Sequence, residues 1–560
     1  MRREASVVNK KVCSFPILFA LLALLIGTCA VVFPASAQAA PTSNGSITVS
    51  GTVASSYDAY QIFSANVVDG DSDAKIATDL AWASDAVREA ALPVLHSAGM
   101  PNSQTTAQEA AEWLNTDSHL TSELSAQLAR SLQSSGAVSV ALNAGTAAEL
   151  PCGYWLIVAD DDAIAQGEAG TAPIMALVGG SAVTVKPKAS TPKVSKHVLE
   201  DVTAAWQKAA DATVADDLYW RLSATVPAGL TAYDTYTVRF VDTMSAGLDP
   251  SKVAASMHVY VAVGADGGFD AVACEGGNAN STPAKGWTDI TSHCRVSIEG
   301  NAFTVRTGDL IAALGGADAF AAGARVVAVY DAPLGANCNR GATKGNPNEV
   351  YLRYPRSPLA DQSGDTGFTR TPSDDACAYT WDLALTKRGS DGDKPLAGAV
   401  LSIADDRGRT LAADGTWDAE GKVTVTTGED GRVTVSGVDS GKLEVRELKA
   451  PKGYTAFEGT RSVTVKAEGL DVDQVAAAMP KLTITAESPL RADSADGSTG
   501  SLEASLINTP TGTPPSITTG GFMPSTGDMA MYAAAAAAVA GAALIVVALL
   551  VKRGGGSHKE

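Results

Sequence analysis

The segment Lys442-Leu-Glu-Val-Arg-Glu447-Leu-Lys-Ala-Pro-Lys-Gly-Tyr454 alternates apolar and polar side chains and then reaches a turn-forming Pro and Gly. Successive side chains of a β-strand point to opposite faces of a sheet, so Leu443 and Val445 share one face. Similar short alternating runs, broken by Gly, Asp, Asn and Pro, fill most of the chain. The pattern predicts a mainly β protein built from tandem antiparallel β-sandwich domains.

Size and charge limit the possible classes of protein. The chain has 560 residues and a formal charge of −19, and at about 100–150 residues per domain it has room for three or four domains. Its basic residues are scattered, which argues against a nucleic-acid partner. It has no Gly-x-Ser-x-Gly, His-Glu-x-x-His or phosphate-loop motif, so we expect no conventional enzyme, no cofactor and no metal site.

The turn-rich stretches divide the middle of the chain into domains. We expect a first domain over 40–187, a second over 188–358, a polar linker over 359–378 and a third domain over 379–508. The first domain should also carry a helix within Gln104–Gln133, because one apolar stripe recurs there every four residues. The stripe consists of Leu120, Leu124, Leu128 and Leu132.

The N-terminal residues 1–39 have the pattern of a secretory signal peptide. Basic residues at the start are followed by an apolar run from Phe15 to Phe33 and by small residues at cleavage-site spacing over Ala35–Ala39. Such a segment is removed on export. We therefore expect the mature protein to be secreted.

The C-terminal end combines a linker, a short motif and an apolar span. A Pro-, Gly- and Thr-rich linker over 509–522 leads to the motif 523–527, an uncharged span over 531–551 and a basic tail over 552–560. The span is long enough to cross a bilayer as a helix, and the basic tail places the preceding chain outside the cell.

The motif Met523-Pro524-Ser525-Thr526-Gly527 resembles the cell-wall sorting signal Leu-Pro-x-Thr-Gly, with Met in place of Leu. The resemblance implies that a sortase cleaves after Thr526 and that the product is anchored to the cell wall of a Gram-positive bacterium. The precursor would be held only transiently in the membrane.

Polar residues in each of the later domains share a face with the apolar residues of their strand. Glu447, for example, continues the face of Leu443 and Val445. Buried charges cost free energy unless they are paired or neutralised, so inward-facing polar residues are candidates for chemistry. They are Lys196, Asp242 and Asn348 in the second domain and Lys387, Glu447 and Asn508 in the third.

A buried Lys, acid and Asn have a specific chemical use. A desolvated Lys loses its proton readily and becomes a nucleophile, while a protonated carboxyl polarises the Asn carbonyl. Fixed contact supplies a high effective molarity, and the product is an intramolecular Lys–Asn isopeptide bond with loss of ammonia. In this interpretation Asp242 and Glu447 are the promoting acids. The alternative is that each set is a buried ion pair or hydrogen-bonded group.

Several motifs resemble known domains and favour the isopeptide interpretation. The segment 442–454 is similar to the E-box of collagen-adhesin B-type and pilin domains, with Leu448 where Thr is usual and no opening Tyr. The segment around Lys196, Asp242 and Asn348 is similar to the fimbrial isopeptide-formation domain of backbone pilins. Asn346 shares the parity of Asn348 and is the alternative. The resemblance implies Ig-like, collagen-adhesin B-type sandwiches.

One lysine at the junction of the first two domains is expected to face solvent. In Val183-Thr-Val-Lys186-Pro-Lys188 the valines point inward, so Lys186 and Lys188 take the outer face. The segment resembles the pilin motif whose last Lys attacks the sortase-bound Thr of another subunit. We therefore predict Lys188 as the polymerisation nucleophile, with Lys186 and Lys193 as alternatives.

Five cysteines remain after removal of the signal peptide, and export permits disulfides. Cys274 with Cys294 is the first candidate pair and Cys338 with Cys377 the second, which leaves Cys152 over. Spacing does not settle the connectivity.

Together these features predict a structural subunit of a covalently polymerised pilus (fimbria). Its expected partners are a sortase and identical subunits, with minor pilins and host surface ligands as further possibilities. The alternative function is a monomeric, sortase-anchored cell-wall adhesin that binds a host ligand.

Overall fold

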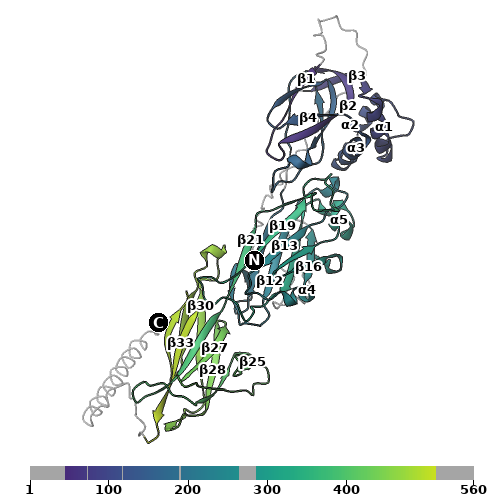
Figure 1. Ribbon diagram of the computed structural model, residues 1–560. Helices are drawn as coiled ribbons and strands as arrows, with labels where there is room; N and C mark the ends of the chain where they lie inside the picture. Colours follow the sequence, from purple (N-terminus) through teal and green to yellow (C-terminus); the bar gives the residue numbers. More distant parts are fainter. Residues whose placement is uncertain (1–43, 72–73, 117, 188–190, 264–285, 513–560) are drawn as a thin grey trace, which may run out of the picture.

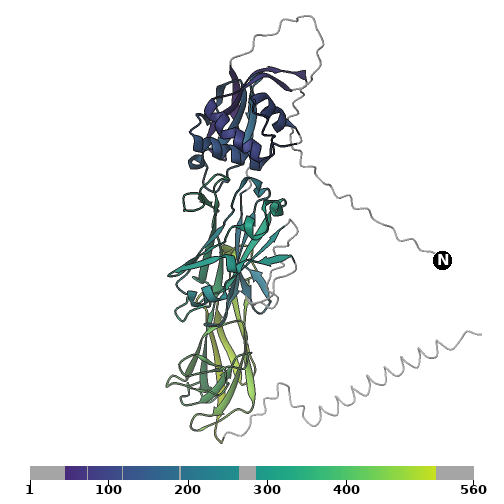
Figure 2. The same cartoon turned by 90° about the vertical axis from the view of Figure 1, so that its right-hand side faces the viewer.

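The computed structural model describes residues 44–71, 74–116, 118–187, 191–263 and 286–512. In these ranges the chain forms three β-rich domains arranged end to end (Figure 1), and the view turned by 90° shows the same row (Figure 2). No helix within these ranges is long and apolar enough to cross a membrane. Several predicted features lie outside the described residues: the signal peptide 1–39, Lys188, Cys274, the motif 523–527 and the span 531–551.

The first domain packs two sheets against each other. One has the order β5-β1-β8, and the other has the order β3-β2-β6-β7 with β4 also paired to β2. Alternation along β6 serves two cores, because Ile157 faces the β5-β1-β8 sheet while Leu156 and Val158 face the helices. The strands are β1 (Asn44–Val49), β2 (Ser56–Asp69), β3 (Lys75–Trp82), β4 (Ser139–Asn143), β5 (Ala147–Pro151), β6 (Gly153–Ala159), β7 (Ile174–Val178) and β8 (Val183–Val185).

The helical part of this domain is larger than predicted. It consists of α1 (Asp85–Ser97), α2 (Ala107–Asn115) and α3 (Ser122–Ser135). Three leucines of the predicted stripe are buried on α3, but Leu120 is 39% exposed. Thr121 caps α3 by accepting a hydrogen bond from the Leu124 backbone N–H, so the helix begins after Leu120.

The second domain is a sandwich of two larger sheets. Their orders are β10-β9-β12-β18-β14-β15 and β11-β21-β19-β13-β17-β16, with β20 also paired to β19. The elements are β9 (Val194–Glu200), β10 (Ala205–Gln207), β11 (Ala209–Asp211), β12 (Tyr219–Val226), β13 (Arg239–Met244), α4 (Val253–Ser256), β14 (His258–Val263), β15 (Trp287–Asp289), β16 (Arg295–Glu299), β17 (Ala302–Arg306), α5 (Leu310–Ala313), β18 (Ala324–Asp331), β19 (Asn346–Pro355), β20 (Phe368–Arg370) and β21 (Asp374–Tyr379).

The predicted linker over 359–378 is wrong. Within it, β20 and β21 both pair with β19, and β21 also runs parallel to β11. The inward residues of β21 are Ala376 and Ala378, whose small side chains give a weak alternation signal beside the polar turns. The second domain therefore extends to about Tyr379.

The third domain begins at Trp381 and is also a two-sheet sandwich. One sheet has the order β27-β22-β33-β29 with β32 also paired to β33, and the other has the order β25-β24-β23-β28-β30-β31 with β26 also paired to β23. The strands are β22 (Trp381–Gly389), β23 (Val400–Ala404), β24 (Thr410–Leu411), β25 (Trp417–Asp418), β26 (Val425–Thr426), β27 (Arg432–Val438), β28 (Gly441–Lys449), β29 (Tyr454–Thr455), β30 (Thr460–Glu468), β31 (Lys481–Ala486), β32 (Leu490–Asp496) and β33 (Ser501–Pro510).

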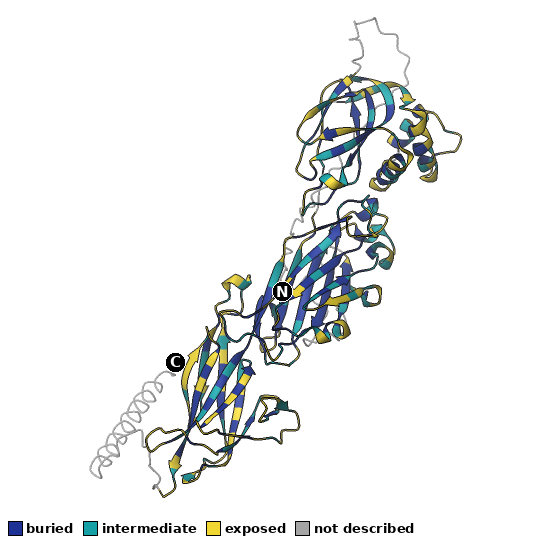
Figure 3. Ribbon diagram, viewed as in Figure 1, coloured by how far each residue is buried: buried dark blue, intermediate teal, exposed yellow. Residues whose placement is uncertain are grey.

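The first and last strands of this domain, β22 and β33, run side by side in parallel. The last strand reaches Pro510, two residues into the linker predicted over 509–522, because Thr509 and Pro510 pair with β29. Buried residues alternate along the strands of all three domains (Figure 3). The predicted fold class, tandem β-sandwiches with helix added to the first domain, is confirmed.

Candidate functional site

The three predicted polar residues of the second domain meet in its core. Lys196 lies on β9 in one sheet, while Asp242 on β13 and Asn348 on β19 lie in the facing sheet. All three side chains are fully buried. Each strand places its polar residue inward by continuing the alternation of its apolar neighbours, as predicted.

A fourth residue, Tyr330 on β18, connects this group. Lys196 Nζ forms an ion pair with Asp242 Oδ2 and donates a hydrogen bond to the Tyr330 hydroxyl oxygen at 2.9 Å. The same oxygen accepts a hydrogen bond from Asn348 Nδ2 at 2.9 Å, and the hydroxyl donates to Asp242 Oδ2 at 3.1 Å. Tyr330 shares the parity of Val326 and Ala328 on β18, but a tyrosine in phase with apolar residues is also an ordinary core residue, so the sequence does not single it out.

Burial shifts the charges of this group toward their neutral forms. Desolvation lowers the pKa of Lys196 to about 8, against the opposing effect of Asp242. Desolvation also raises the pKa of Asp242, although Lys196 and Tyr330 act in the other direction. A neutral amine beside a protonated carboxyl is the state in which Lys is nucleophilic.

Asn346 has the same parity as Asn348 but a different environment. Its amide donates to the backbone oxygens of Asn339 at 3.0 Å and Ala378 at 3.2 Å, and its Oδ1 accepts from the Asn339 N–H at 2.9 Å. Its hydrogen bonds therefore hold the loop before β19. Asn348 is the residue that lies in the Lys196 group.

The third domain holds a second, more direct group. Lys387 on β22 donates a hydrogen bond to Asn508 Oδ1 on the neighbouring strand β33 and lies 3.2 Å from Glu447 Oε1. Asn508 Nδ2 donates to both Glu447 oxygens, at 2.9 and 3.1 Å. The Glu447 Oε2 also accepts the Phe457 backbone N–H at 3.1 Å.

This group is dry and suited to amine attack on an amide. Lys387 has no exposed surface, and desolvation lowers its pKa to about 8. Glu447 contacts both reacting side chains from the opposite sheet, through β28. The contact of Lys387 Nζ with the Asn508 carboxamide places amine and amide where effective molarity is high.

The residues around the predicted polymerisation lysine follow the expected parity. Val185 is buried, whereas Thr184 and Lys186 are exposed, and Lys193 is exposed on the other side of the undescribed residues 188–190. The assignment of Lys188 stays a prediction.

The described cysteines include both members of only one of the two candidate disulfide pairs. Cys294 is a thiol whose Sγ donates to the Ile290 carbonyl at 3.3 Å, and its candidate partner Cys274 lies outside the described residues. Cys338 and Cys377 are both free, so the second candidate pair is not bridged. Cys152 is buried in the first domain.

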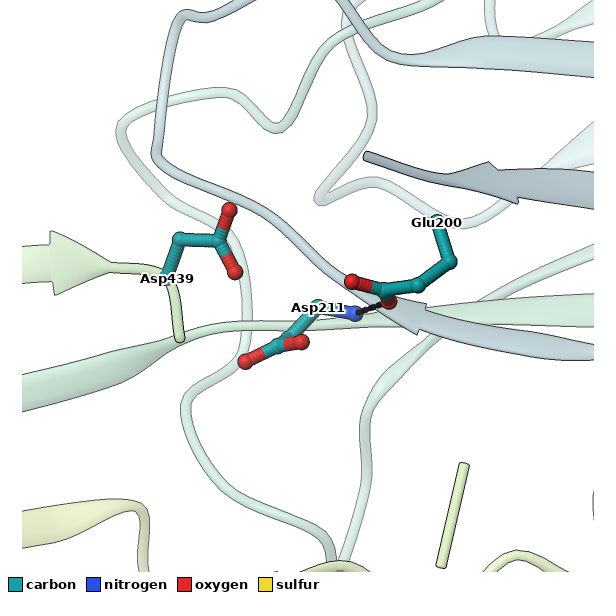
Figure 4. Close-up of side chains that lie close together, drawn as sticks. All are labelled: Glu200, Asp211 and Asp439. Atoms are coloured by element: carbon teal, nitrogen blue, oxygen red, sulfur yellow. Dashed lines mark hydrogen bonds between the residues drawn. The ribbon is translucent and has the colours of Figure 1, made fainter. Parts of the chain in front are cut away.

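A cluster of carboxylates lies where the second and third domains meet. Glu200, Asp211 and Asp439 bring carboxylate oxygens within 4.8 Å of one another, and Figure 4 shows them converging from separate segments. Asp211 Oδ2 accepts hydrogen bonds from Trp381 Nε1 at 2.7 Å and from the Ser440 hydroxyl at 2.7 Å. These bonds connect β11 of the second domain with the third domain.

The carboxylates of this cluster hold protons more tightly than usual. Burial, with a contribution from Asp211, raises the pKa of Glu200 to about 8. Burial also raises the pKa of Asp211 and of Asp439. Carboxylate oxygens are ligands of the kind that calcium prefers, and a proton shared between two carboxylates would also relieve their repulsion.

Fold and site together define a class: a row of β-sandwich domains, two of which enclose a buried Lys, acid and Asn. The family model described as "SpaA: Prealbumin-like fold domain" matches residues 382–477. Residues 382–477 of the third domain are therefore similar to a SpaA-type, prealbumin-like domain, in agreement with the family resemblance of its motifs.

Individual relatives are surface and pilus proteins. The chain is 30% identical over 129 residues to the trypsin-resistant surface T6 protein of Streptococcus pyogenes serotype M6, and the match spans 22% of the length of each. The T6 backbone pilin structure from that serotype is 17% identical with a TM-score of 0.45, over 84% of this chain and 98% of that one. The major pilin SpaD from Corynebacterium diphtheriae is 15% identical with a TM-score of 0.41, over 83% and 98%.

Proposed function

We propose that this protein is a structural subunit of a covalently polymerised pilus on a Gram-positive cell surface. The observation that carries the proposal is the pair of buried groups, Lys196–Asp242–Asn348 and Lys387–Glu447–Asn508. In each group, most of the domain's sequence lies between the Lys and the Asn. The SpaA-type match over 382–477 and the likeness to the T6 surface protein support it.

Each buried group closes one intramolecular isopeptide bond. The neutral Lys Nζ attacks the Asn Cγ, the Nζ–Cγ bond forms, the Cγ–Nδ2 bond breaks and ammonia leaves. Asp242 or Glu447 polarises the Asn carbonyl during the attack. The chain reacts once, on itself, and needs no cofactor, so it is not an enzyme in the usual sense.

Subunits are joined by a different bond. A sortase cleaves after Thr526 and transfers the Thr526 carbonyl carbon to Lys188 of the next subunit, which forms an amide between chains. The last subunit is transferred to the cell wall. The apolar span 531–551 holds the precursor in the membrane until cleavage, and the partners are the sortase and identical copies of the chain.

Immunoblots of cell-wall extracts test the polymer directly. Wild-type chain should give a high-mass ladder, and Lys188→Arg should collapse it to the monomer. Lys422→Arg, which changes an exposed lysine of the third domain, is the matched control and should keep the ladder.

Two outcomes contradict the proposal. A ladder that survives simultaneous Arg substitution of Lys186, Lys188 and Lys193 rejects the assigned junction lysine. A wild-type chain found in the wall only as a monomer supports the adhesin alternative instead.

A further inference from the structure

The two buried groups differ in how the acid reaches the Asn. In the third domain Asn508 Nδ2 donates straight to Glu447. In the second domain Asn348 Nδ2 donates to the Tyr330 hydroxyl oxygen, and that hydroxyl donates to Asp242. Because Lys196 Nζ also donates to this oxygen, one hydroxyl touches the nucleophile, the amide and the acid.

Packing fixes the Tyr330 hydroxyl in this position. The side chain is fully buried, and its ring meets Phe303 edge-on with centroids 4.8 Å apart. Lys196 Nζ lies 5.4 Å from the centre of the same ring and 5.5 Å from that of Trp220. Because the ring is held in place, the hydroxyl hydrogen is the part of Tyr330 that can still reorient, by rotation about the C–O bond.

The reaction creates a proton-transfer problem that this hydroxyl can solve. When Lys196 Nζ bonds to the Asn348 Cγ, Nζ must lose a proton and Nδ2 must gain one before ammonia can leave. A planar amide nitrogen only donates hydrogen bonds. After attack, Nδ2 is a tetrahedral amine with a lone pair, so its contact with Tyr330 can reverse direction.

We propose that Tyr330 is a catalytic residue of the second-domain cross-link and carries a proton from Lys196 Nζ to Asn348 Nδ2. The phenol oxygen takes the proton that Nζ releases, the original hydroxyl proton goes to Nδ2, the Cγ–Nδ2 bond breaks and ammonia leaves. Tyr330 ends as a neutral phenol and Asp242 is unchanged, so protons balance. The inference rests on the proposed internal bond.

The electrostatics favour a concerted transfer. Burial and the neighbouring Asp242 raise the pKa of Tyr330 well above its ordinary value, so a free phenolate is disfavoured. The transfer therefore requires both nitrogens to contact the oxygen together, as they do at 2.9 Å each.

The test compares Tyr330→Phe with Tyr354→Phe in the full chain. Tyr354 is also fully buried in the second domain, and its hydroxyl has no hydrogen-bond partner among the described residues, so its loss is the matched control. Each chain is expressed with its own signal peptide in a Gram-positive host without pilus sortases. Tryptic peptides joined by each bond are followed by mass spectrometry over time after synthesis.

We expect Tyr330→Phe to slow the Lys196–Asn348 bond at least tenfold and to leave the Lys387–Asn508 bond at the wild-type rate. Formation of the Lys387–Asn508 bond is thus an internal control, which shows that the same variant molecule was exported and folded. Tyr354→Phe should form both bonds normally. Formation of the Lys196–Asn348 bond at the wild-type rate in Tyr330→Phe overturns the role of Tyr330 and leaves the proposed function standing.

A wild-type chain that forms no Lys196–Asn348 bond overturns the internal bond and the role of Tyr330 together. Should Tyr330→Phe fail to fold, site-specific 3,5-difluorotyrosine at position 330 preserves the hydroxyl and its contacts but makes the proton more acidic. A changed rate of bond formation is expected, and an unchanged rate counts against the proton transfer.

Discussion

Replacing Glu447 by Gln should prevent the cross-link of the third domain while preserving the shape of the side chain. Gln has no carboxyl group to take part in the proton transfers of the amine attack, although it can still accept the Phe457 N–H. We expect Lys387 and Asn508 to remain separate residues. Tryptic digestion should then release their two peptides unlinked.

The loss of stability follows from the length of chain that the bond closes. Lys387 and Asn508 are 121 residues apart, and the chain-entropy relation derived for disulfides gives about 5 kcal/mol at 25 °C for such a loop. Over the 130 residues of 379–508, an unfolding entropy of about 2.1 cal/mol/K per residue converts this to a fall in Tm of about 18 °C.

Stability alone does not separate a covalent bond from a buried ion pair. Removing one partner of a buried pair also costs about 3–5 kcal/mol, so the mass of the peptides must accompany the melting curve. Glu444→Gln is the matched control, because Glu444 lies on the same strand but pairs with Lys442 at the surface. A Glu447→Gln chain in which the Lys387 and Asn508 peptides are still joined, or a wild-type chain in which these two peptides are never joined, refutes the reasoning.

Three further predictions follow from the same contacts. In Asn346→Ala, the mass of the tryptic peptides should show that the Lys196–Asn348 bond still forms. The unfolding free energy should fall by about 1–3 kcal/mol, because the Asn339 and Ala378 backbone groups lose hydrogen-bond partners. Loss of the bond would show that Asn346 belongs to the reacting group. The pKa of Glu200 is raised in the folded state from 4.5 to about 8, so its contribution to stability is present in acid and is lost as pH rises through this window. Melting curves should thus show that the unfolding free energy of Glu200→Gln, relative to that of wild type, rises by roughly 3 kcal/mol between pH 4 and pH 7. A difference between the two proteins that does not change with pH would contradict the raised pKa. Single-molecule pulling between positions 188 and 526 should lengthen the second and third domains by no more than about 130 Å, whereas complete unfolding of either domain would show that its bond is absent.

Alternation predicted the buried groups because it is a property of single strands. Lys196 and Glu447 lie in phase with apolar neighbours on their own strands, so each could be placed inward without knowing which strand lies opposite. The same parity made Asn346 and Asn348 equivalent. Only the position of the Asn339 loop, which depends on the whole fold, separates them.

Other features depend on contacts between distant segments. Alternation marks Tyr330 only as an inward residue, and its contacts with Asp242 and Asn348 arise only because β18 faces β13 and β19 across the core. Likewise, the inward residues of β21 are small, and the strand is stabilised by its pairing with β11 and β19. The Glu200, Asp211 and Asp439 cluster unites segments that carry no shared motif.

The proposed bonds divide the chain into segments that bear tension and segments that do not. Force applied at Lys188 reaches Lys196 within eight residues and crosses to Asn348 through the first bond, so 197–347 are bypassed. It then runs along 349–386 to Lys387 and crosses the second bond to Asn508, which bypasses 388–507. The first domain, before Lys188, lies outside this path.

Between the two bonds, the stretch 349–386 therefore bears tension without a covalent bypass, and it holds most of β19 and all of β21. Its restraints are non-covalent: the ladders of β21 with β11 and β19, the Lys208–Asp374 ion pair at 2.5 Å and the Trp381–Asp211 hydrogen bond at 2.7 Å. The β11–β21 pairing is parallel, and both strands belong to the joint between the domains. The carboxylate cluster lies at this joint, so its protonation affects the stretch between the two bonds, which neither bond bypasses.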